Sequence, residues 1–83
     1  MNECRVLLFA RARDLAGSDA VTLTLAAGAT VVDVRRMLAE RFPGLAEWLP
    51  RCAIGVNGEY ADDATAIPPG AEIAVLPPVS GGT

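Results

Sequence analysis

The sequence has 83 residues, enough for one small domain, and its 52% hydrophobic and 20% charged content predicts a folded rather than a disordered chain. A net charge of −3 without any basic cluster argues against a nucleic-acid partner. All seven basic residues are arginine and histidine is absent, so the commonest general base and metal ligand are missing. We therefore expect no metal site, no stably bound cofactor and no catalysis by this chain alone.

Two further features concern the compartment. The first residues lead directly into a strand pattern, and no segment approaches the run of about 20 apolar residues that crosses a bilayer. Cys4 and Cys52 form no Cys-x-x-Cys motif, so we interpret both as small buried hydrophobic residues. These features predict a cytoplasmic protein without a membrane partner.

The chain opens with a pattern of two strands. Cys4 to Ala12 alternate as a strand, and residues 13–19 supply turn chemistry with at most one helical turn. Ala20 to Leu25 alternate apolar residues with threonine, which is typical of a half-buried strand. The first quarter of the sequence therefore predicts a hairpin.

A helix is predicted next. Apolar residues at helical spacing run from Val31 to Phe42, and Thr30 is placed as the N-cap. Asp33 follows three residues after Thr30, which is a variant of the capping box and suits the helix dipole. Pro43-Gly44 ends the helix.

The second half predicts three short strands. Leu45 to Pro50 form an irregular segment in which Trp48 covers the core. Cys52 to Val56 form a strand, and Asn57-Gly58 is a strong signal for a hairpin into another brief strand. Ala71 to Leu76 form the closing strand.

A hairpin, a helix, a short strand pair and a closing strand suggest the β-grasp arrangement, in which the first and last strands pair under one helix. We therefore predict an α+β, ubiquitin-like fold with a mixed sheet of about five strands on one main helix. Residues 1–76 would form this domain, and residues 77–83 would form a flexible C-terminal Gly-Gly tail.

The predicted strands are apolar on both faces. If Val6, Leu8, Ile73 and Val75 face the helix, a second apolar set lies on the open face of the sheet. Its members are Leu7, Phe9, Ala74 and Leu76, with Tyr60 nearby. A sheet covered on one side is usually polar on the other, so this set predicts a protein partner. A slip in register, or cover by Leu45 to Pro50, would make the set smaller.

The chain ends in an unusual tail. Pro77-Pro78 stiffen the exit from the sheet, and Gly81-Gly82 make the narrowest backbone available, able to enter a tight channel. Such tails are commonly only frayed ends. A position directly after a closing β-grasp strand makes a functional tail the stronger interpretation.

Three segments together resemble the molybdopterin synthase small-subunit (MoaD) family, which is similar in fold to ubiquitin and to the thiamin sulfur carrier. The segments are Val6 to Gly17, Val56 to Tyr60, and Pro69 to Gly82, the last with the sequence Pro-Pro-Val-Ser-Gly-Gly at its end. The resemblance covers nearly the whole chain, and it supports the predicted fold.

The resemblance implies a sulfur relay that works through Gly82. An adenylating enzyme would use ATP to join the Gly82 carboxylate to AMP, and a sulfur donor would convert the adenylate into a thiocarboxylate. The tail would then deliver sulfur to cyclic pyranopterin monophosphate in molybdenum cofactor biosynthesis. The chain would act as a sulfurtransferase only together with the large synthase subunit.

The resemblance also implies the partners: a MoaE-like large subunit in a heterotetramer, and a MoeB-like adenylyltransferase of the ubiquitin-activating kind. Phe9, Tyr60 and Leu76 fall at family positions that contact these partners, and they coincide with the apolar set that contains Leu7. Arg13 is a further candidate for the activating enzyme, although a solvated arginine at a turn looks the same. The tail residues that would enter the partner's channel are Pro77, Pro78, Val79, Ser80 and Gly81.

One residue departs from the family pattern, in which the second glycine is terminal. Here Thr83 follows Gly82, so it is removed by a peptidase, is an expression artefact or variant, or marks a chain that carries no sulfur; we expect removal or an artefact. Other functions remain open. They are a sulfur carrier for thiamin, cysteine or tRNA thiolation, a ubiquitin-like protein modifier, and a non-covalent interaction module.

Overall fold

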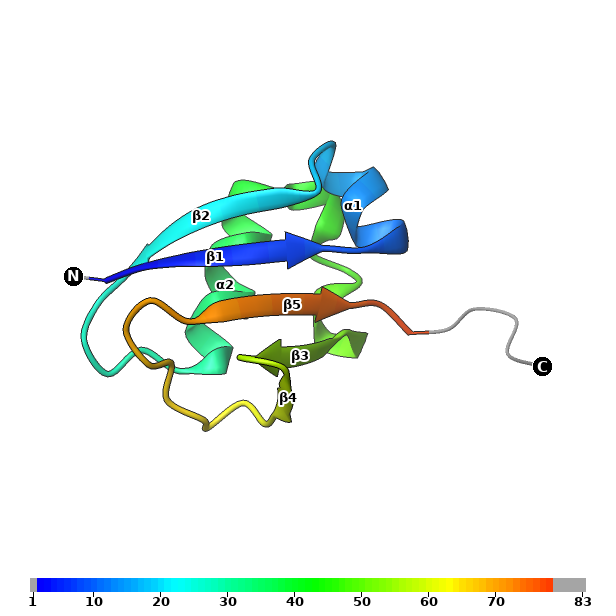
Figure 1. Cartoon of the computed structure of the whole chain (residues 1–83). Coiled ribbons are helices and arrows are strands. Elements are labelled where there is room, and N and C mark those ends of the chain that lie inside the picture. Colours follow the sequence, from blue (N-terminus) through cyan, green and yellow to red (C-terminus); the bar gives the residue numbers. More distant parts are fainter. Residues whose placement is uncertain (1, 79–83) are drawn as a thin grey trace.

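The computed structural model describes residues 2–78 (Figure 1). The strands are β1 (Asn2–Leu8), β2 (Ala20–Leu25), β3 (Ala53–Val56), β4 (Glu59–Ala61) and β5 (Glu72–Leu76). The helices are α1 (Ala10–Ala16) and α2 (Val31–Arg41), followed by the short 3-10 turns η1 (Pro43–Leu45) and η2 (Leu49–Arg51). The strands form one sheet in the order β2-β1-β5-β3-β4.

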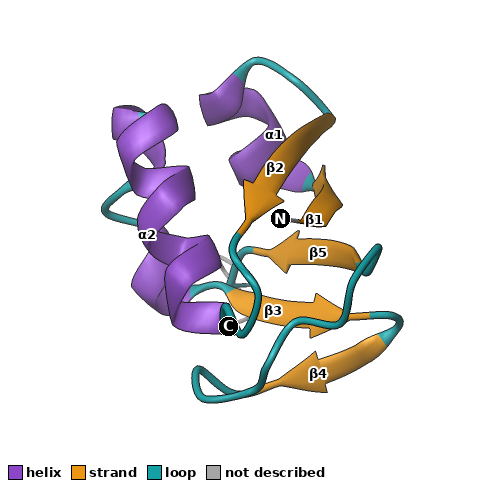
Figure 2. Ribbon diagram, turned by 90° about the vertical axis from the view of Figure 1, so that its left-hand side faces the viewer, coloured by secondary structure: helices purple, strands orange, loops and turns teal. Residues whose placement is uncertain are grey.

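The first and last strands pair at the centre of this sheet. β1 runs parallel to β5, whereas β1 with β2, β3 with β5 and β3 with β4 are antiparallel. The helices cover one face, so that the molecule has two layers (Figure 2). The predicted β-grasp fold with its mixed sheet is confirmed.

The core lies between the sheet and α2. Leu8, Ile54 and Val75 share one row of the sheet, and Val34 and Leu38 of α2 are completely buried. Each buried aliphatic side chain contributes about 1.5–3 kcal/mol relative to an exposed one. The same core contains both cysteines, which confirms them as buried residues.

The predicted N-terminus of α2 is confirmed. Thr30 is the N-cap, and its backbone N–H donates to Asp33 Oδ2 at 2.8 Å within a capping box. Asp33 also accepts from Arg36 Nη2 at 3.0 Å. The Thr30 N–H bond, with the Arg36 bond second, lowers the pKa of Asp33 below its ordinary value. The helix ends at Arg41, before Pro43.

Arg35 ties α2 to two distant segments. Its side chain is only 17% exposed. Nε donates to Asp63 Oδ1 at 2.8 Å, and Nη1 donates to the carbonyl oxygens of Leu49 and of Cys52, the latter at 2.8 Å. One planar guanidinium therefore pairs with backbone carbonyls that frame the start of β3.

The predicted strand over Cys4 to Ala12 is wrong at its end. The strand stops at Leu8, and residues 10–16 form α1, longer than the single helical turn predicted for residues 13–19. The alternating Ala-Arg-Ala-Arg sequence imitates a strand, but alanine and arginine are among the best helix formers. Burial of Ala12 against the core and a left-handed Gly17 cap stabilise the helix instead.

The other predicted elements occur with small shifts. The strand Ala20–Leu25 has the predicted bounds, and β3 starts at Ala53 rather than Cys52. Asn57 and Gly58 both have positive φ, 51° and 86°, as a two-residue hairpin turn requires. Trp48 is half-buried against the core, as expected.

Within residues 2–78, the longest helices fall short of the length and hydropathy that a bilayer crossing requires.

The pKa of Asp33 makes the stability of the protein dependent on pH. A lowered folded-state pKa stabilises the fold above the ordinary carboxyl pKa of about 4, and this contribution disappears as the pH falls through the folded-state value. We predict that Asp33→Asn is less stable than wild type at pH 7 and that the difference shrinks toward zero in acid. Urea unfolding at several pH values measures it; a difference independent of pH would contradict the assignment.

The Arg35 contacts predict a marked loss of stability on substitution. Arg35→Met leaves the two carbonyl oxygens and Asp63 without this donor, so the free energy of unfolding should fall by about 1–3 kcal/mol in urea. Arg36→Met is the matched control, because Arg36 is 61% exposed and its pair with Asp33 lies on the helix surface, where solvent screens it. Equal losses in the two variants would contradict the stabilising role assigned to the Arg35 contacts.

Candidate functional site

The open face of the sheet carries a continuous row of side chains from all five strands. The register places Ala20 beside Leu7, Leu7 beside Ala74, Ala74 beside Gly55, and Gly55 beside Tyr60. Because neighbouring residues in a strand point to opposite faces, this row points away from α2. The predicted register, which put Leu7 and Ala74 on the open face, is therefore confirmed.

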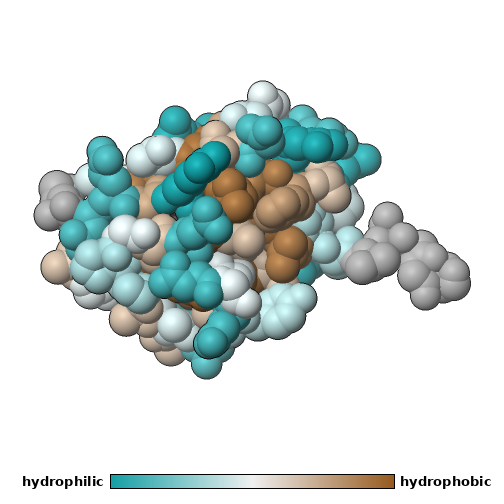
Figure 3. All heavy atoms as spheres, viewed as in Figure 1, coloured by the Kyte–Doolittle hydropathy of each residue, from teal (hydrophilic) through white to brown (hydrophobic). Residues whose placement is uncertain are grey.

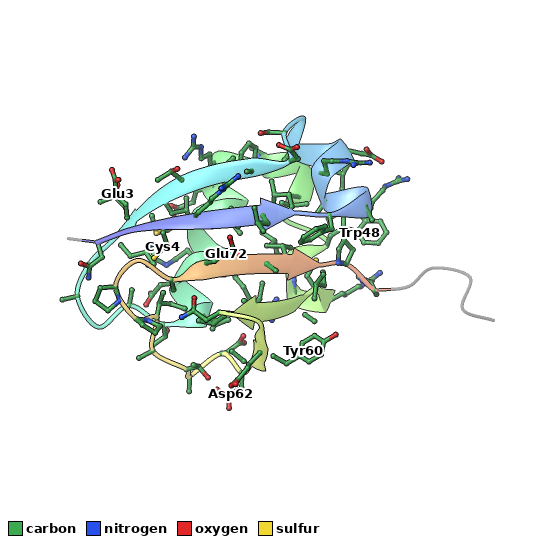
Figure 4. The ribbon with its side chains drawn as sticks, in the orientation of Figure 1. Glu3, Cys4, Trp48, Tyr60, Asp62 and Glu72 are labelled. Atoms are coloured by element: carbon green, nitrogen blue, oxygen red, sulfur yellow. The ribbon has the colours of Figure 1, made fainter. Side chains whose placement is uncertain are left out.

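Polarity divides this face into two halves. Around the starts of β1 and β5 lies a polar half, formed by Glu3, Arg5, Thr22, Thr24 and Glu72. Toward their ends lies an apolar half, formed by Leu7, Phe9, Ala53, Gly55, Tyr60, Ala74 and Leu76. Figure 3 shows hydrophobic surface gathered over this second region, and Figure 4 shows Tyr60 toward the end of β5 and Glu3 toward the opposite end.

The predicted interface residues lie in or beside the apolar half. Phe9 is 43% exposed and Tyr60 is 80% exposed, whereas Leu7 and Leu76 are half-buried. Leu7, Phe9 and Arg13 line one hollow, which brings the arginine to the rim of the apolar half. Tyr60 lies across the sheet on β4. The structure thus places all five residues on one side of the molecule, and their role at a partner interface stays a prediction.

A strained residue fixes the position of Phe9. Phe9 is extended, and the next residue, Ala10, has φ of 50°, in the left-handed region that costs a non-glycine residue roughly 1–2 kcal/mol. This turn allows the Phe9 carbonyl to accept from the N–H groups of Ala12 and Arg13 at 3.0 and 3.3 Å. The chain therefore enters α1 while the Phe9 ring remains on the open face.

The hairpin between β3 and β4 fixes Tyr60. Asn57 anchors it to β5, because its N–H donates to the Glu72 carbonyl at 2.8 Å and its Oδ1 accepts from Glu72 N–H at 3.0 Å. Tyr60 then stands opposite Gly55 on the edge strand. Backbone pairing therefore places this residue at the border of the apolar half.

The tail begins at the same border. Pro77 is half-buried and Pro78 is exposed directly after β5. Trp48 lies toward the same end of the sheet in Figure 4, with the Arg11 guanidinium 5.6 Å from its ring centroid. The predicted tail residues Val79, Ser80, Gly81 and Gly82, together with Thr83, lie outside the described residues.

Among residues 2–78, no cluster of three or more potential metal-ligating side chains occurs. Burial raises the pKa of the Cys52 thiol, with Arg35 opposing this shift, so Cys52 stays protonated at neutral pH.

Two residues that shape the site, Gly55 and Ala10, were not identified from the sequence. Gly55 interrupts the row between Ala74 and Tyr60, and a glycine inside a strand is a known signal for close approach by another chain. The strain at Ala10 had no signal in the sequence, because alanine rarely adopts a positive φ.

The strand order and the helix that covers one face of the sheet define a ubiquitin-like β-grasp protein. The chain belongs to the ThiS family, whose model matches residues 6–82. Molybdopterin synthase sulfur carrier subunits are its homologues. The one from Arabidopsis thaliana is 39% identical over 80 residues, which cover 96% of this chain and 83% of that protein.

Solved structures agree with the family. The crystal structure of SAMP1 from Haloferax volcanii has a TM-score of 0.87 and 31% identity, covering 98% of this chain and 100% of that one. A chain in the complex of subunits 1 and 2 of the molybdopterin-converting factor from Helicobacter pylori 26695 has a TM-score of 0.70 and 30% identity, with coverage of 96% and 99%. The resemblance predicted from the sequence is confirmed at the level of family and fold.

The exposure of Tyr60 predicts that its ring contributes little to folding. Tyr60→Thr, which keeps a residue suited to strands, should change the free energy of unfolding by less than about 0.5 kcal/mol in urea. Leu8→Ala in the same sheet is the contrast, because truncation of this buried side chain leaves a cavity and should cost about 2–5 kcal/mol. A large loss for Tyr60→Thr would mean that the ring supports the fold and is not available to a partner.

Proposed function

We propose that this chain is the sulfur carrier subunit of a molybdopterin synthase. The observation that carries the proposal is the apolar half of the open face, which borders the point where Pro77 leaves β5 toward Gly82. A partner that covers this half also receives the tail. Homologues named as sulfur carrier subunits, and the complex of subunits 1 and 2 in Helicobacter pylori, support the same conclusion.

The proposed chemistry takes place on the Gly82 carboxylate. The carboxylate attacks the α-phosphate of ATP on an activating enzyme, which releases pyrophosphate and leaves an acyl adenylate. A persulfide of the sulfur donor displaces AMP, and a second thiol cleaves the resulting S–S bond to leave the thiocarboxylate. Two such carriers in succession supply the two sulfurs of the dithiolene built on cyclic pyranopterin monophosphate.

Geometry limits how the tail can act. The six residue steps from Leu76 to Gly82 span at most about 22 Å, so the active site of the partner has to lie within that distance of the end of β5. Docking holds the thiocarboxylate beside its target, which makes the attack effectively intramolecular. The apolar half thus binds the partner, and the tail carries the sulfur to be transferred.

Docking has to offset the ordering of the tail. Fixing each backbone residue costs about 1–2 kcal/mol, or roughly 5–10 kcal/mol for residues 78–82. Burial of roughly 200–400 Å² of apolar surface, at about 25 cal/mol per Å², offsets this cost. An exposed apolar half that spans the sheet from Phe9 to Tyr60 is the feature that can supply such an area.

The composition fits a carrier that depends on its partners. The chain contains neither histidine nor lysine, so general bases and ammonium groups for the reaction come from the partner enzymes. The partners in this proposal are the large synthase subunit, an ATP-dependent adenylyltransferase and a sulfur donor. We place two carriers and two large subunits in a heterotetramer.

A second function is favoured by one comparison. SAMP1, which matches with a TM-score of 0.87, belongs to proteins named small archaeal modifier proteins. As a modifier, this chain would use the same Gly82 adenylate but form an amide with a lysine of another protein. The absence of lysine would prevent chains of the modifier on itself.

The mass of the protein from its native host tests the proposal. We predict a chain that ends at Gly82, with Thr83 removed and with a fraction in which sulfur replaces one carboxyl oxygen. The replacement is expected because the activated carboxylate is stored as the thiocarboxylate between deliveries. Intact-mass spectrometry of the freshly purified protein measures both the loss of Thr83 and the gain of sulfur.

The same spectra separate the alternatives. Species whose mass equals this chain plus a host protein, joined through a lysine, would identify a modifier. A uniform chain that retains Thr83 would contradict sulfur transfer and leave a non-covalent interaction module as the function. A variant that lacks both Gly82 and Thr83 is the matched control, because it folds alike and should never acquire sulfur.

A further inference from the structure

The two edges of the sheet differ in how they are protected. β4 forms one edge, and it has only three residues, one of them the charged Glu59. β2 forms the other edge with six residues, Ala20–Leu25 (Figure 1). A long edge strand exposes N–H and C=O groups that can pair with a further strand, and proteins usually protect it with charged residues, proline or a bulge.

The sequence of β2 contains none of the usual protecting residues. Ala-Val-Thr-Leu-Thr-Leu has no charged residue, no proline and no glycine. Its β-branched and aliphatic side chains suit a strand, and short uncharged segments of this kind readily pair edge to edge. Thr22 and Thr24 are exposed. The composition of β2 therefore favours strand addition, and any protection comes from outside the strand.

The backbone groups that face the free edge follow from the alternation along β2. The N–H of Leu8 donates to the Asp19 carbonyl at 2.9 Å, so residue 19 and every second residue after it turn their backbone groups toward β1. Ala20, Thr22 and Thr24 turn theirs the other way. The N–H and C=O groups of these three residues are the ones that an added strand would pair with.

Two side chains already occupy carbonyl groups on this edge. Ser18 Oγ donates to the Ala20 carbonyl at 2.9 Å, and Arg41 Nη1 donates to the Thr22 carbonyl at 3.0 Å. Arg41 is the last residue of α2, and its guanidinium lies 5.7 Å from the centroid of the Phe42 ring. The helix layer therefore places a positive charge at the centre of an otherwise uncharged edge.

We propose that the outer edge of β2 is a strand-addition site for a second copy of this chain, and that Arg41 keeps it closed. Antiparallel pairing about Thr22 sets Thr22 opposite Thr22 and Ala20 opposite Thr24, so β2 is complementary to itself and no charges within it oppose each other. Each Thr22 N–H would then donate to the Thr22 carbonyl of the other copy.

Arg41 opposes this pairing in two ways. It occupies the Thr22 carbonyl that the second copy would need, and two Arg41 guanidiniums would meet near the twofold axis with like charge. The inference concerns the free chain, so it stands apart from the proposed function.

Removal of the arginine tests the proposal. Arg41→Met keeps a long apolar side chain but removes the donor and the charge. We predict that sedimentation velocity finds the wild type monomeric and the variant dimeric, with a dimer dissociation constant at least roughly tenfold lower than that of the wild type. A variant that stays monomeric over the same concentration range would overturn the proposal, as would a wild type that dimerises equally well.

Arg36→Met is the matched control. It removes the same charge from the same helix, but Arg36 pairs with Asp33 and makes no bond to β2. It should remain monomeric like the wild type. Equal association by Arg36→Met would show that loss of net positive charge is enough, and the specific role of Arg41 would be wrong.

Two further measurements locate the contact. Thr22→Lys in the Arg41→Met background places like charges opposite each other on the twofold axis, so this double variant should be monomeric again. In the Arg41→Met dimer, hydrogen exchange at the Thr22 and Thr24 amides should slow as the protein concentration rises. Association that survives Thr22→Lys, or that leaves these two amides unprotected, would come from partial unfolding or another surface and would overturn the proposal.

Discussion

The parallel pairing of β1 with β5 is the constraint on which both the core and the site depend. It aligns Val6 with Ile73 and Leu8 with Val75, so the most deeply buried rows of the sheet come from the two ends of the sequence. Because parallel strands end at the same edge, it also brings Phe9 beside the exit of the tail. One pairing therefore makes the core and places the apolar half next to the point where Pro77 leaves β5.

In the proposed function, the apolar half binds the partner and the tail carries the sulfur. The apolar half is held by backbone devices: the left-handed Ala10 behind Phe9 and the Asn57-Gly58 turn in front of Tyr60. None of these needs a charged or nucleophilic side chain. A chain without histidine or lysine can therefore take part in sulfur transfer, provided that its partners supply acid, base and cations. The same surface and tail also suit a protein modifier, which explains why one fold serves both classes.

Local patterns in the sequence predicted most of the fold. The alternation of Ala20 to Leu25, the capping box at Thr30 and the Asn57-Gly58 turn each have a short-range physical cause, and each was confirmed. The helix α1 was missed because its seven residues bury only Ala12, which leaves almost no amphipathic signal. Gly55 was missed because its place on the open face depends on pairing with Ala74 of β5, a strand distant in sequence. The roles of the tail residues come from resemblance and lie beyond the described chain.

The most direct test of the account is a single-turnover reaction with a chain that carries a thiocarboxylate at Gly82. Mixed with the large subunit and cyclic pyranopterin monophosphate, this form should yield the dithiolene product with two carriers consumed for each product. The same chain with an ordinary Gly82 carboxylate should bind the large subunit and yield none. If the thiocarboxylate form bound the large subunit but transferred no sulfur, this chain would be a docking module and the central claim would be contradicted.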